Sequence, residues 1–113
     1  MESILTSIKK LLGYTEDYKI FDADIIMHIN TVFMTLNQLG VGSDEVFNIE
    51  DDLAVWKDFL GDNEKEISAV KTYIYQRVKL IFDPPMNSAH IQALQKSIDE
   101  FEWRCNLQAE SKK

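Results

Sequence analysis

The sequence has few of the residues that mark a disulfide scaffold, a zinc site or a loop-rich protein. Its single cysteine, Cys105, excludes an intramolecular disulfide and a cysteine-rich zinc site. It has two prolines and four glycines among 113 residues, so long irregular stretches are not expected. A composition that is 45% hydrophobic and 11% aromatic can build a core. Together these features predict one mostly helical domain that spans residues 1–113.

Basic side chains are also in short supply. Twelve Lys and Arg residues oppose 19 Asp and Glu residues, which gives a net charge of −7. This balance argues against a protein that binds nucleic acid by neutralising its phosphates. It suits a protein whose exposed faces repel DNA, or one whose acidity only improves solubility. The chain has no apolar run of about 18 residues and no basic, apolar leader, so we expect no membrane span and synthesis in the cytoplasm.

Motifs that carry catalysis are missing as well. There is no GxGxxG, GxxxxGK[ST] or GxSxG segment. Asp24 and His28 share a helix face, but a metal site usually needs further ligands, so an ion pair or a helix contact is favoured. The apolar and acidic neighbours of Cys105 do not activate a thiol. Tyr73 and Arg77 could stack on a nucleic-acid strand or pair as ring and cation. We expect neither an enzyme nor a bound metal or cofactor.

Hydrophobic periodicity predicts that helices make up most of the chain. Ser3 can cap the first helix and Asp22 the second, which is about 18 residues long. The segment 83–85 (Asp-Pro-Pro) ends another, because proline lacks an N–H donor and restricts the residue before it. Asn87 or Ser88 then caps the last helix. The predicted helices are 3–12, 22–39, 51–60, 63–82 and 88–107, followed by a frayed polar tail at 108–113.

Helix 63–82 carries apolar side chains on more than one side, so it is either central in the core or used in assembly. Its main stripe consists of Ile67, Val70, Ile74, Val78 and Ile81, and Tyr73 lies off that stripe. The inward stripe of the last helix consists of Ile91, Leu94, Ile98, Phe101 and Cys105. The surplus of apolar side chains fits a protein whose remaining apolar surface is covered by partner proteins, although an ordinary core accounts for it equally.

The least regular part of the chain lies between the second long helix and the third. Its residues 46–49 could form a short strand or an extended arm, and a strand would have no obvious partner in the same chain. The predicted fold is therefore all-α. It is a small helical bundle of three to four main helices, with a long irregular arm or short strand segment around residues 41–52.

Several segments resemble one viral family. They are FDADIIMHINTVF at 21–33, LGVG at 39–42, WKDFLG at 56–61, VKTYIY at 70–75, KLIFDPP at 79–85 and EFEWR at 100–104. In this order they are similar to the head–tail connector (adaptor or head-completion) proteins of long-tailed bacteriophages and prophages. The resemblance extends from about residue 3 to residue 107.

The resemblance implies a structural virion protein at the head–tail interface. Such a protein forms a ring of copies, dodecameric in the virion, beneath the portal protein. The ring extends the DNA channel and joins the DNA-filled head to a stopper or tail-completion protein, and DNA passes through it without specific binding. The family also implies a helical bundle with a long irregular arm, in which the last helix reaches the portal.

Two sets of residues follow as predicted contacts. Three side chains of the last helix are predicted to dock on the portal: Trp103, Arg104 and Leu107. Three side chains of the irregular region are predicted to contact neighbouring subunits or the next ring: Phe47, Ile49 and Trp56. Local packing is the alternative for each of them. The alternative function is a small helical regulatory protein that binds one host or phage protein.

Overall fold

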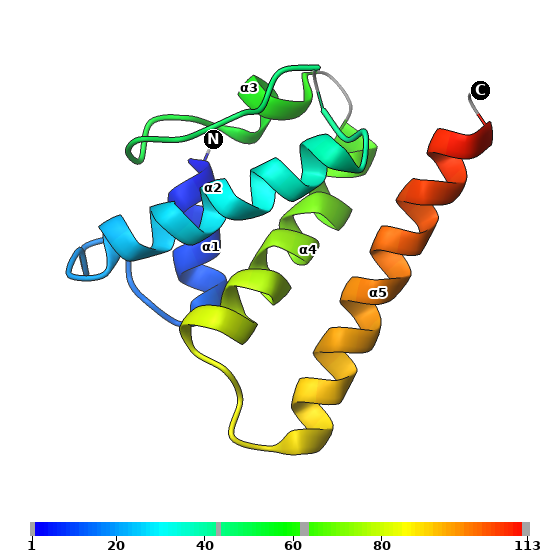
Figure 1. Ribbon diagram of the computed structural model, residues 1–113. Helices are drawn as coiled ribbons and strands as arrows, with labels where there is room; N and C mark the ends of the chain where they lie inside the picture. Colours follow the sequence, from blue (N-terminus) through cyan, green and yellow to red (C-terminus); the bar gives the residue numbers. More distant parts are fainter. Residues whose placement is uncertain (1, 43, 62–63, 112–113) are drawn as a thin grey trace.

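A computed structural model describes residues 2–42, 44–61 and 64–111 of the chain. These residues form five helices and no strand (Figure 1), which confirms the all-α prediction. The helices are α1 (Ile4–Leu12), α2 (Asp22–Gln38), α3 (Trp56–Leu60), α4 (Glu64–Phe82) and α5 (Ser88–Ser111). Within the described ranges, β-type pairing is limited to an isolated antiparallel bridge between Ser3 and Val55.

The N-terminal helix begins where its sequence predicts, but α2 begins differently. Ser3 Oγ accepts the N–H of Thr6 at 3.1 Å, which caps α1. Phe21 occupies the N-cap position of α2 and makes no capping hydrogen bond, so the prediction that Asp22 is the cap is wrong. Asp22 is instead the first helical residue, and its carboxylate lies 2.9 Å from the ammonium of Lys9. Lys9 is 2% exposed, and pairing this buried cation explains why Asp22 is drawn away from the capping position.

Helix α4 is the centre of the fold, because it packs against each of the other four helices. Three of its residues, Val70, Ile74 and Val78, are fully buried on the predicted stripe. Tyr73 was predicted off the stripe but is 1% exposed, since α5 covers that second side of α4 and stacks Phe101 on the Tyr73 ring at 4.4 Å. The core also contains Ile4, Leu5, Ile8, Ile25, Ile29, Val32, Phe33, Leu36, Ile49, Trp56, Phe59 and Ile98.

The segment between α2 and α3 is an extended arm that crosses over α2 (Figure 1). Asn30 holds it in place: its side-chain Nδ2 donates to the carbonyl of Ile49 at 2.9 Å, and its Oδ1 accepts the N–H of Ile49 at 2.8 Å. These bonds satisfy the backbone N–H and carbonyl of Ile49 without a partner strand. Of the two predicted alternatives, strand and arm, the structure has the arm.

Helix α3 is shorter than predicted and starts at Trp56 instead of Asp51 or Asp52. The side chain of Asp58 accepts the N–H of Val55 at 2.9 Å, which sets the helix start at that point. The Asp51 carboxylate instead accepts the N–H of Leu53 at 3.0 Å, a local turn that competes with helix formation.

Helix α5 is capped by Asn87, whose Oδ1 accepts the N–H of Ala89 at 2.8 Å. It continues through Ser111, beyond its predicted end near Leu107, so the predicted tail is helical as far as the structure describes it. Residues 112–113 of that tail lie outside the described residues. Among the helices, α5 has an extensive interface with α4 alone, and its C-terminal end projects away from the rest of the bundle (Figure 1).

Candidate functional site

The outer face of α5 presents two of the predicted docking residues. Trp103 is 62% exposed and Leu107 is 44% exposed. They are four residues apart, so their side chains share one face of the helix. A large aromatic ring left in solvent is costly unless a partner covers it, and such rings dominate the energy of protein interfaces. This face can therefore supply an apolar anchor for a partner protein.

Polar bonds on the opposite side hold α5 against α4. Glu102 Oε2 accepts the hydroxyl of Tyr73 at 2.6 Å and the guanidinium of Arg77 at 2.9 Å. The Arg77 guanidinium also lies 5.9 Å from the Tyr73 ring centre, so the ring–cation pairing predicted for these residues is present. Burial, reinforced by the hydrogen bond to Glu102, raises the pKa of Tyr73 well above its ordinary value. Because Tyr73 is buried, its ring is not available to stack on nucleic acid.

A cleft of about 750 Å³ opens where α5 diverges from the bundle; we call it the α5 cleft. It is lined by residues 39–42, 59–61, 65, 66, 69, 70, 101, 104, 105 and 108. Most of the lining is apolar, and the charged members are Lys65, Glu66 and Arg104. The structure therefore places Arg104 at the α5 cleft, whereas Trp103 and Leu107 are not among the residues that line it.

Cys105 also lines the α5 cleft and is 8% exposed. Burial, with smaller contributions from the carboxylates of Glu66 and Glu102, raises the pKa of its thiol. A raised pKa keeps the sulfur protonated and unreactive. Cys105 therefore acts as a small apolar residue at this position, as predicted.

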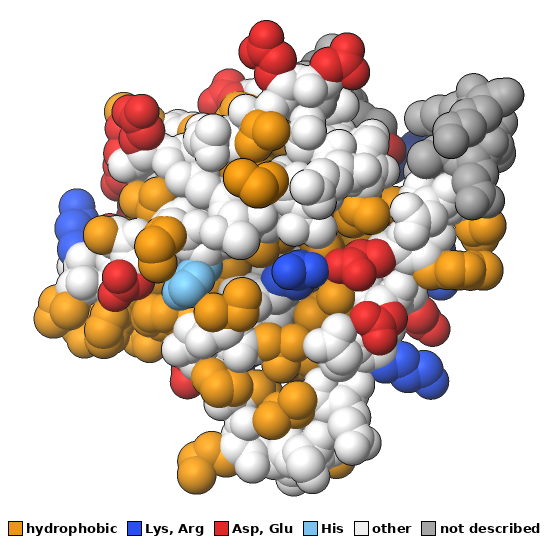
Figure 2. Space-filling model, viewed as in Figure 1, with side chains coloured by type: hydrophobic (Ala, Val, Ile, Leu, Met, Phe, Trp, Pro, Cys, Tyr) orange, Lys and Arg blue, Asp and Glu red, His pale blue; other side chains and the backbone are white. Residues whose placement is uncertain are grey.

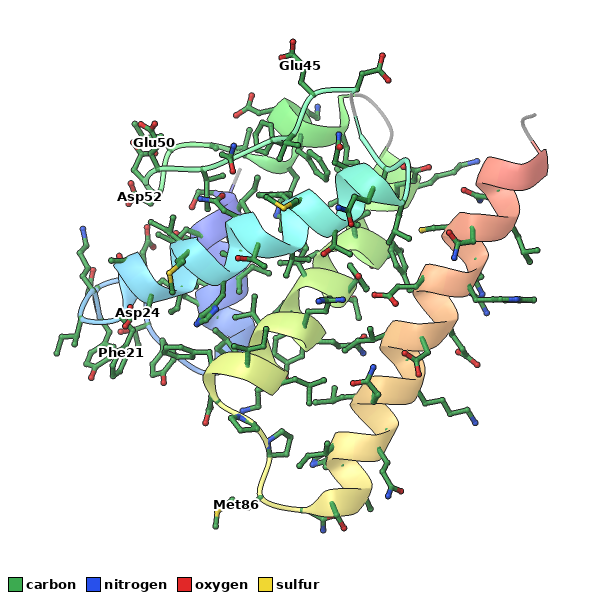
Figure 3. All side chains as sticks on the ribbon, in the orientation of Figure 1. Phe21, Asp24, Glu45, Glu50, Asp52 and Met86 are labelled. Atoms are coloured by element: carbon green, nitrogen blue, oxygen red, sulfur yellow. The ribbon has the colours of Figure 1, made fainter. Side chains whose placement is uncertain are left out.

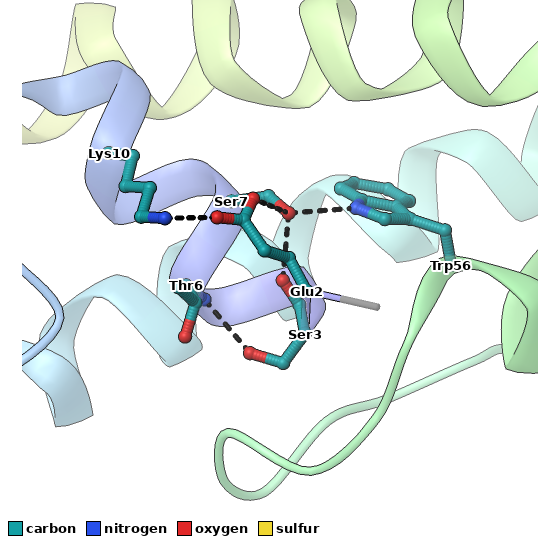
Figure 4. A network of polar contacts seen from close by, with 6 residues as sticks. All are labelled: Glu2, Ser3, Thr6, Ser7, Lys10 and Trp56. Carbon is teal, nitrogen blue, oxygen red and sulfur yellow. Dashed lines mark hydrogen bonds and ion pairs between the residues drawn. The ribbon is translucent and has the colours of Figure 1, made fainter.

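Two of the three residues predicted to contact neighbouring subunits are buried in the single chain, and the third is half-buried. Ile49 and Trp56 are 2% and 4% exposed, and Phe47 is half-buried. The Trp56 indole N–H donates to Ser7 Oγ at 3.1 Å, within a network that includes the ion pair of Glu2 and Lys10 (Figure 4). The Phe47 ring lies 5.2 Å from both Phe33 and Phe59, and the described contacts of all three residues are therefore local packing.

The exposed residues of the arm are different ones. Leu53 is 77% exposed, and Glu50, Asp51 and Asp52 precede it directly. We call residues 50–53 the arm tip. Figure 3 shows the labelled Glu50 and Asp52 pointing outward from it. The predicted helix 51–60 includes Leu53, which lies before α3 in the structure. The three adjacent acidic residues are the signal in the sequence that this leucine is exposed.

A third apolar surface lies around the α1–α2 connector and the turn after α4, where Figure 2 shows orange side chains gathered. The rings of Tyr14, Tyr18, Phe21 and Phe82 pack stacked, tilted or edge to face, with centroids 5.4 to 6.3 Å apart. His28 joins them, 6.1 Å from the Phe82 ring. Periodicity could not identify this cluster, because the connector has no regular secondary structure.

His28 therefore makes the helix contact that was favoured over a metal site. In the part of the chain that the structure describes, there is no group of three or more His, Cys, Asp or Glu residues able to hold a metal ion. No helix among the described residues is long and apolar enough to cross a membrane.

The comparisons with known proteins agree with the resemblance seen in the sequence. The family model described as phage connector protein matches residues 4–112, which is nearly the whole chain. No curated protein and no solved structure matches the chain. The family match confirms the predicted resemblance to head–tail connector proteins. This chain belongs to the phage connector protein family and has a structural connector role in a bacteriophage.

Proposed function

We propose that copies of this chain form a ring beneath the portal protein of a tailed phage, at the head–tail interface of the virion. The ring extends the DNA channel from the filled head and offers a platform to the stopper or tail-completion protein. In this function the chain is a structural protein and not an enzyme. The observation that carries the proposal, beyond the family match, is the projecting helix α5 with Trp103 exposed on its outer face.

The distribution of apolar surface supports several simultaneous partners. The outer face of α5, the arm tip and the aromatic surface around the α1–α2 connector each expose large apolar side chains, and they lie on different parts of the molecule. A protein with one partner needs one such surface, whereas a ring subunit between two other assemblies needs a surface for each neighbour and each assembly.

The net charge of −7 supports the channel role. Phosphates repel an acidic wall, so DNA can pass through such a ring without adhering to it. The acidic residues of the arm and of α5 are mostly exposed, and they can face a channel at no cost in folding energy.

Portal binding by α5 can be tested with the purified chain and the portal protein of the same phage. Trp103→Ala combined with Leu107→Ala should weaken binding by roughly 30-fold or more, because a buried aromatic anchor contributes about 2 kcal/mol or more. Arg104→Ala is measured separately, since Arg104 faces the cleft. Ile91→Ala is the matched control: Ile91, which was predicted on the inward stripe, is instead an exposed apolar residue at the other end of the same helix.

Circular dichroism must show that the variants are folded. Normal portal binding by a folded Trp103→Ala, Leu107→Ala variant would refute the assignment of α5 to the portal. Native mass spectrometry of the wild-type mixture gives the copy number per portal. A ring predicts many copies, whereas a regulator of a single protein predicts one or two.

A further inference from the structure

The arm tip and the α5 cleft are complementary, and they belong to opposite sides of the same molecule. Figure 3 shows the labelled Glu50 and Asp52 at the far end of the arm from α5. The α5 cleft lies between α5 and the first turns of α4. One molecule therefore cannot place its own tip in its own cleft, but it can offer the tip to one neighbour and the cleft to another.

Their chemistry matches in charge. The arm tip carries three successive carboxylates, on Glu50, Asp51 and Asp52. Among the residues that the structure describes, the charged lining of the cleft is Lys65, Arg104 and Glu66, a net charge of +1 in a chain whose net charge is −7. Most other pairings of two surfaces of so acidic a chain bring like charges together, which suppresses association.

Their apolar parts match as well. Leu53 is 77% exposed at the tip. The cleft offers apolar walls that include Val41, Leu60 and Ala69, within a volume of about 750 Å³. A volume of this size can accommodate a leucine side chain together with the adjacent residues of a turn. Burial of Leu53 there would remove an unfavourable apolar surface from water.

We propose that the arm tip of each copy occupies the α5 cleft of the next copy, with Leu53 in the apolar part and the tip carboxylates beside Lys65 and Arg104. The contact is head-to-tail, so it closes into a ring when the rotation between neighbours permits. This proposal deepens the ring assembly proposed above and rests on it: it names the two surfaces that neighbouring copies share.

Engineered disulfides test the contact directly. Leu53→Cys and Ala69→Cys are combined in a Cys105→Ala background, and the protein is oxidised mildly at high concentration, alone and after mixing with the portal protein. The expected result is a ladder of covalent oligomers on a non-reducing gel, with a disulfide between residues 53 and 69 identified by peptide mass spectrometry. Each single-cysteine variant can form dimers at most. A Leu53→Cys, Lys96→Cys pair is the matched control, because residue 96 is an exposed position on α5 outside the cleft.

A charge swap gives an independent measurement with the cysteine unchanged. Glu50→Lys with Asp52→Lys should weaken self-association by about tenfold or more, and so should Lys65→Glu with Arg104→Glu. The two charge-reversed proteins mixed together should recover association as alternating copies, because each tip then meets a cleft of opposite charge. One chain that carries all four substitutions should recover association with itself. Sedimentation velocity of the free proteins and native mass spectrometry of the portal mixtures provide the readouts.

The outcomes separate this inference from the proposed function. Full rings on the portal without a 53–69 disulfide, and with no effect of the charge reversals, would overturn the tip–cleft contact and leave the ring intact. A disulfide from residue 69 to the portal would show that the portal occupies the cleft, which also overturns the contact. A single copy on each portal in every variant, including the wild type, would overturn the ring and the contact together.

Discussion

The contact between α4 and α5, which we call the α4–α5 seam, includes one carboxylate that accepts two hydrogen bonds from α4, so Glu102→Ala should weaken this contact. Glu102 Oε2 accepts hydrogen bonds from the Tyr73 hydroxyl at 2.6 Å and from Arg77 at 2.9 Å. Among the helices, α5 has its extensive interface with α4 alone, so no second helix compensates. Removal of the carboxylate also leaves the hydroxyl of Tyr73, which is 1% exposed, without this acceptor.

The magnitude can be worked from these contacts. A hydrogen bond to a charged group contributes about 1.5–3 kcal/mol when buried. The side chains of Arg77 and Glu102 are 28% and 29% exposed, so solvent screens this pair and the lower part of that range applies. With the buried hydroxyl included, Glu102→Ala should lower the free energy of unfolding by roughly 2 kcal/mol. For a chain of this size, that corresponds to a fall in Tm of roughly 8 °C.

Thermal and urea denaturation followed by circular dichroism measure the effect. Glu100→Ala is the matched control, because Glu100 is an exposed glutamate on the same helix and the substitution changes helix propensity equally. The control should change stability by no more than about 0.5 kcal/mol. If Glu102→Ala and Glu100→Ala destabilise the protein equally, the Glu102 carboxylate does not hold the seam and the reasoning is wrong.

The same seam has an alkaline dependence. Burial, with the hydrogen bond to Glu102, raises the pKa of Tyr73 above its ordinary value near 10, so the folded protein favours the neutral phenol. The contribution of the Tyr73 phenol to the free energy of unfolding is fully present below pH 10. Above that pH the phenol ionises first in the unfolded chain, so this contribution is lost as the pH rises through the higher pKa of the folded state. Urea denaturation between pH 8 and 11 should therefore show a smaller alkaline loss of stability in Tyr73→Phe than in the wild type. Equal losses would contradict this account.

Three further effects follow from other parts of the fold. Gly42→Ala should lower the free energy of unfolding by about 2 kcal/mol or more, because Gly42 has φ +88 and a Cβ there would lie 2.6 Å from the Phe59 ring. Gly40→Ala should lower it less, because Gly40 has a similar φ of +83 but open space around it. The reverse order in urea denaturation would refute the packing argument. Asn30→Ala removes both side-chain hydrogen bonds to the arm, so it should lower the free energy of unfolding by roughly 2 kcal/mol and speed proteolysis of the arm. An unchanged cleavage rate would show that other contacts hold the arm in place. Iodoacetamide at pH 8 should alkylate Cys105 much more slowly in the folded protein than in urea, since burial raises the pKa of the thiol, and similar rates would mean that the cleft is open to solvent there.

The sequence by itself determined where α1 and α5 begin and where α4 ends, because the signals at these three positions are local. Ser3 caps α1 through a bond to a residue three positions away, and Asn87 caps α5 through bonds to residues two and three positions away. The segment 83–85 ends α4 through its two prolines. The family resemblance, too, was carried by short ordered segments of sequence, and the family match over residues 4–112 confirmed it.

Only the tertiary structure decided which apolar residues stay exposed to solvent and are free to contact a partner. Trp56 and Ile49 look as available in the sequence as Leu53, but bonds to Ser7 and Asn30, 49 and 19 residues away, hold the first two inside and leave Leu53 in solvent. The α5 cleft likewise exists only because α5 leaves the bundle beyond its contacts with α4. Periodicity reports one face of one helix, whereas exposure depends on which distant segment covers that face, and no pattern within a few residues specifies that partner.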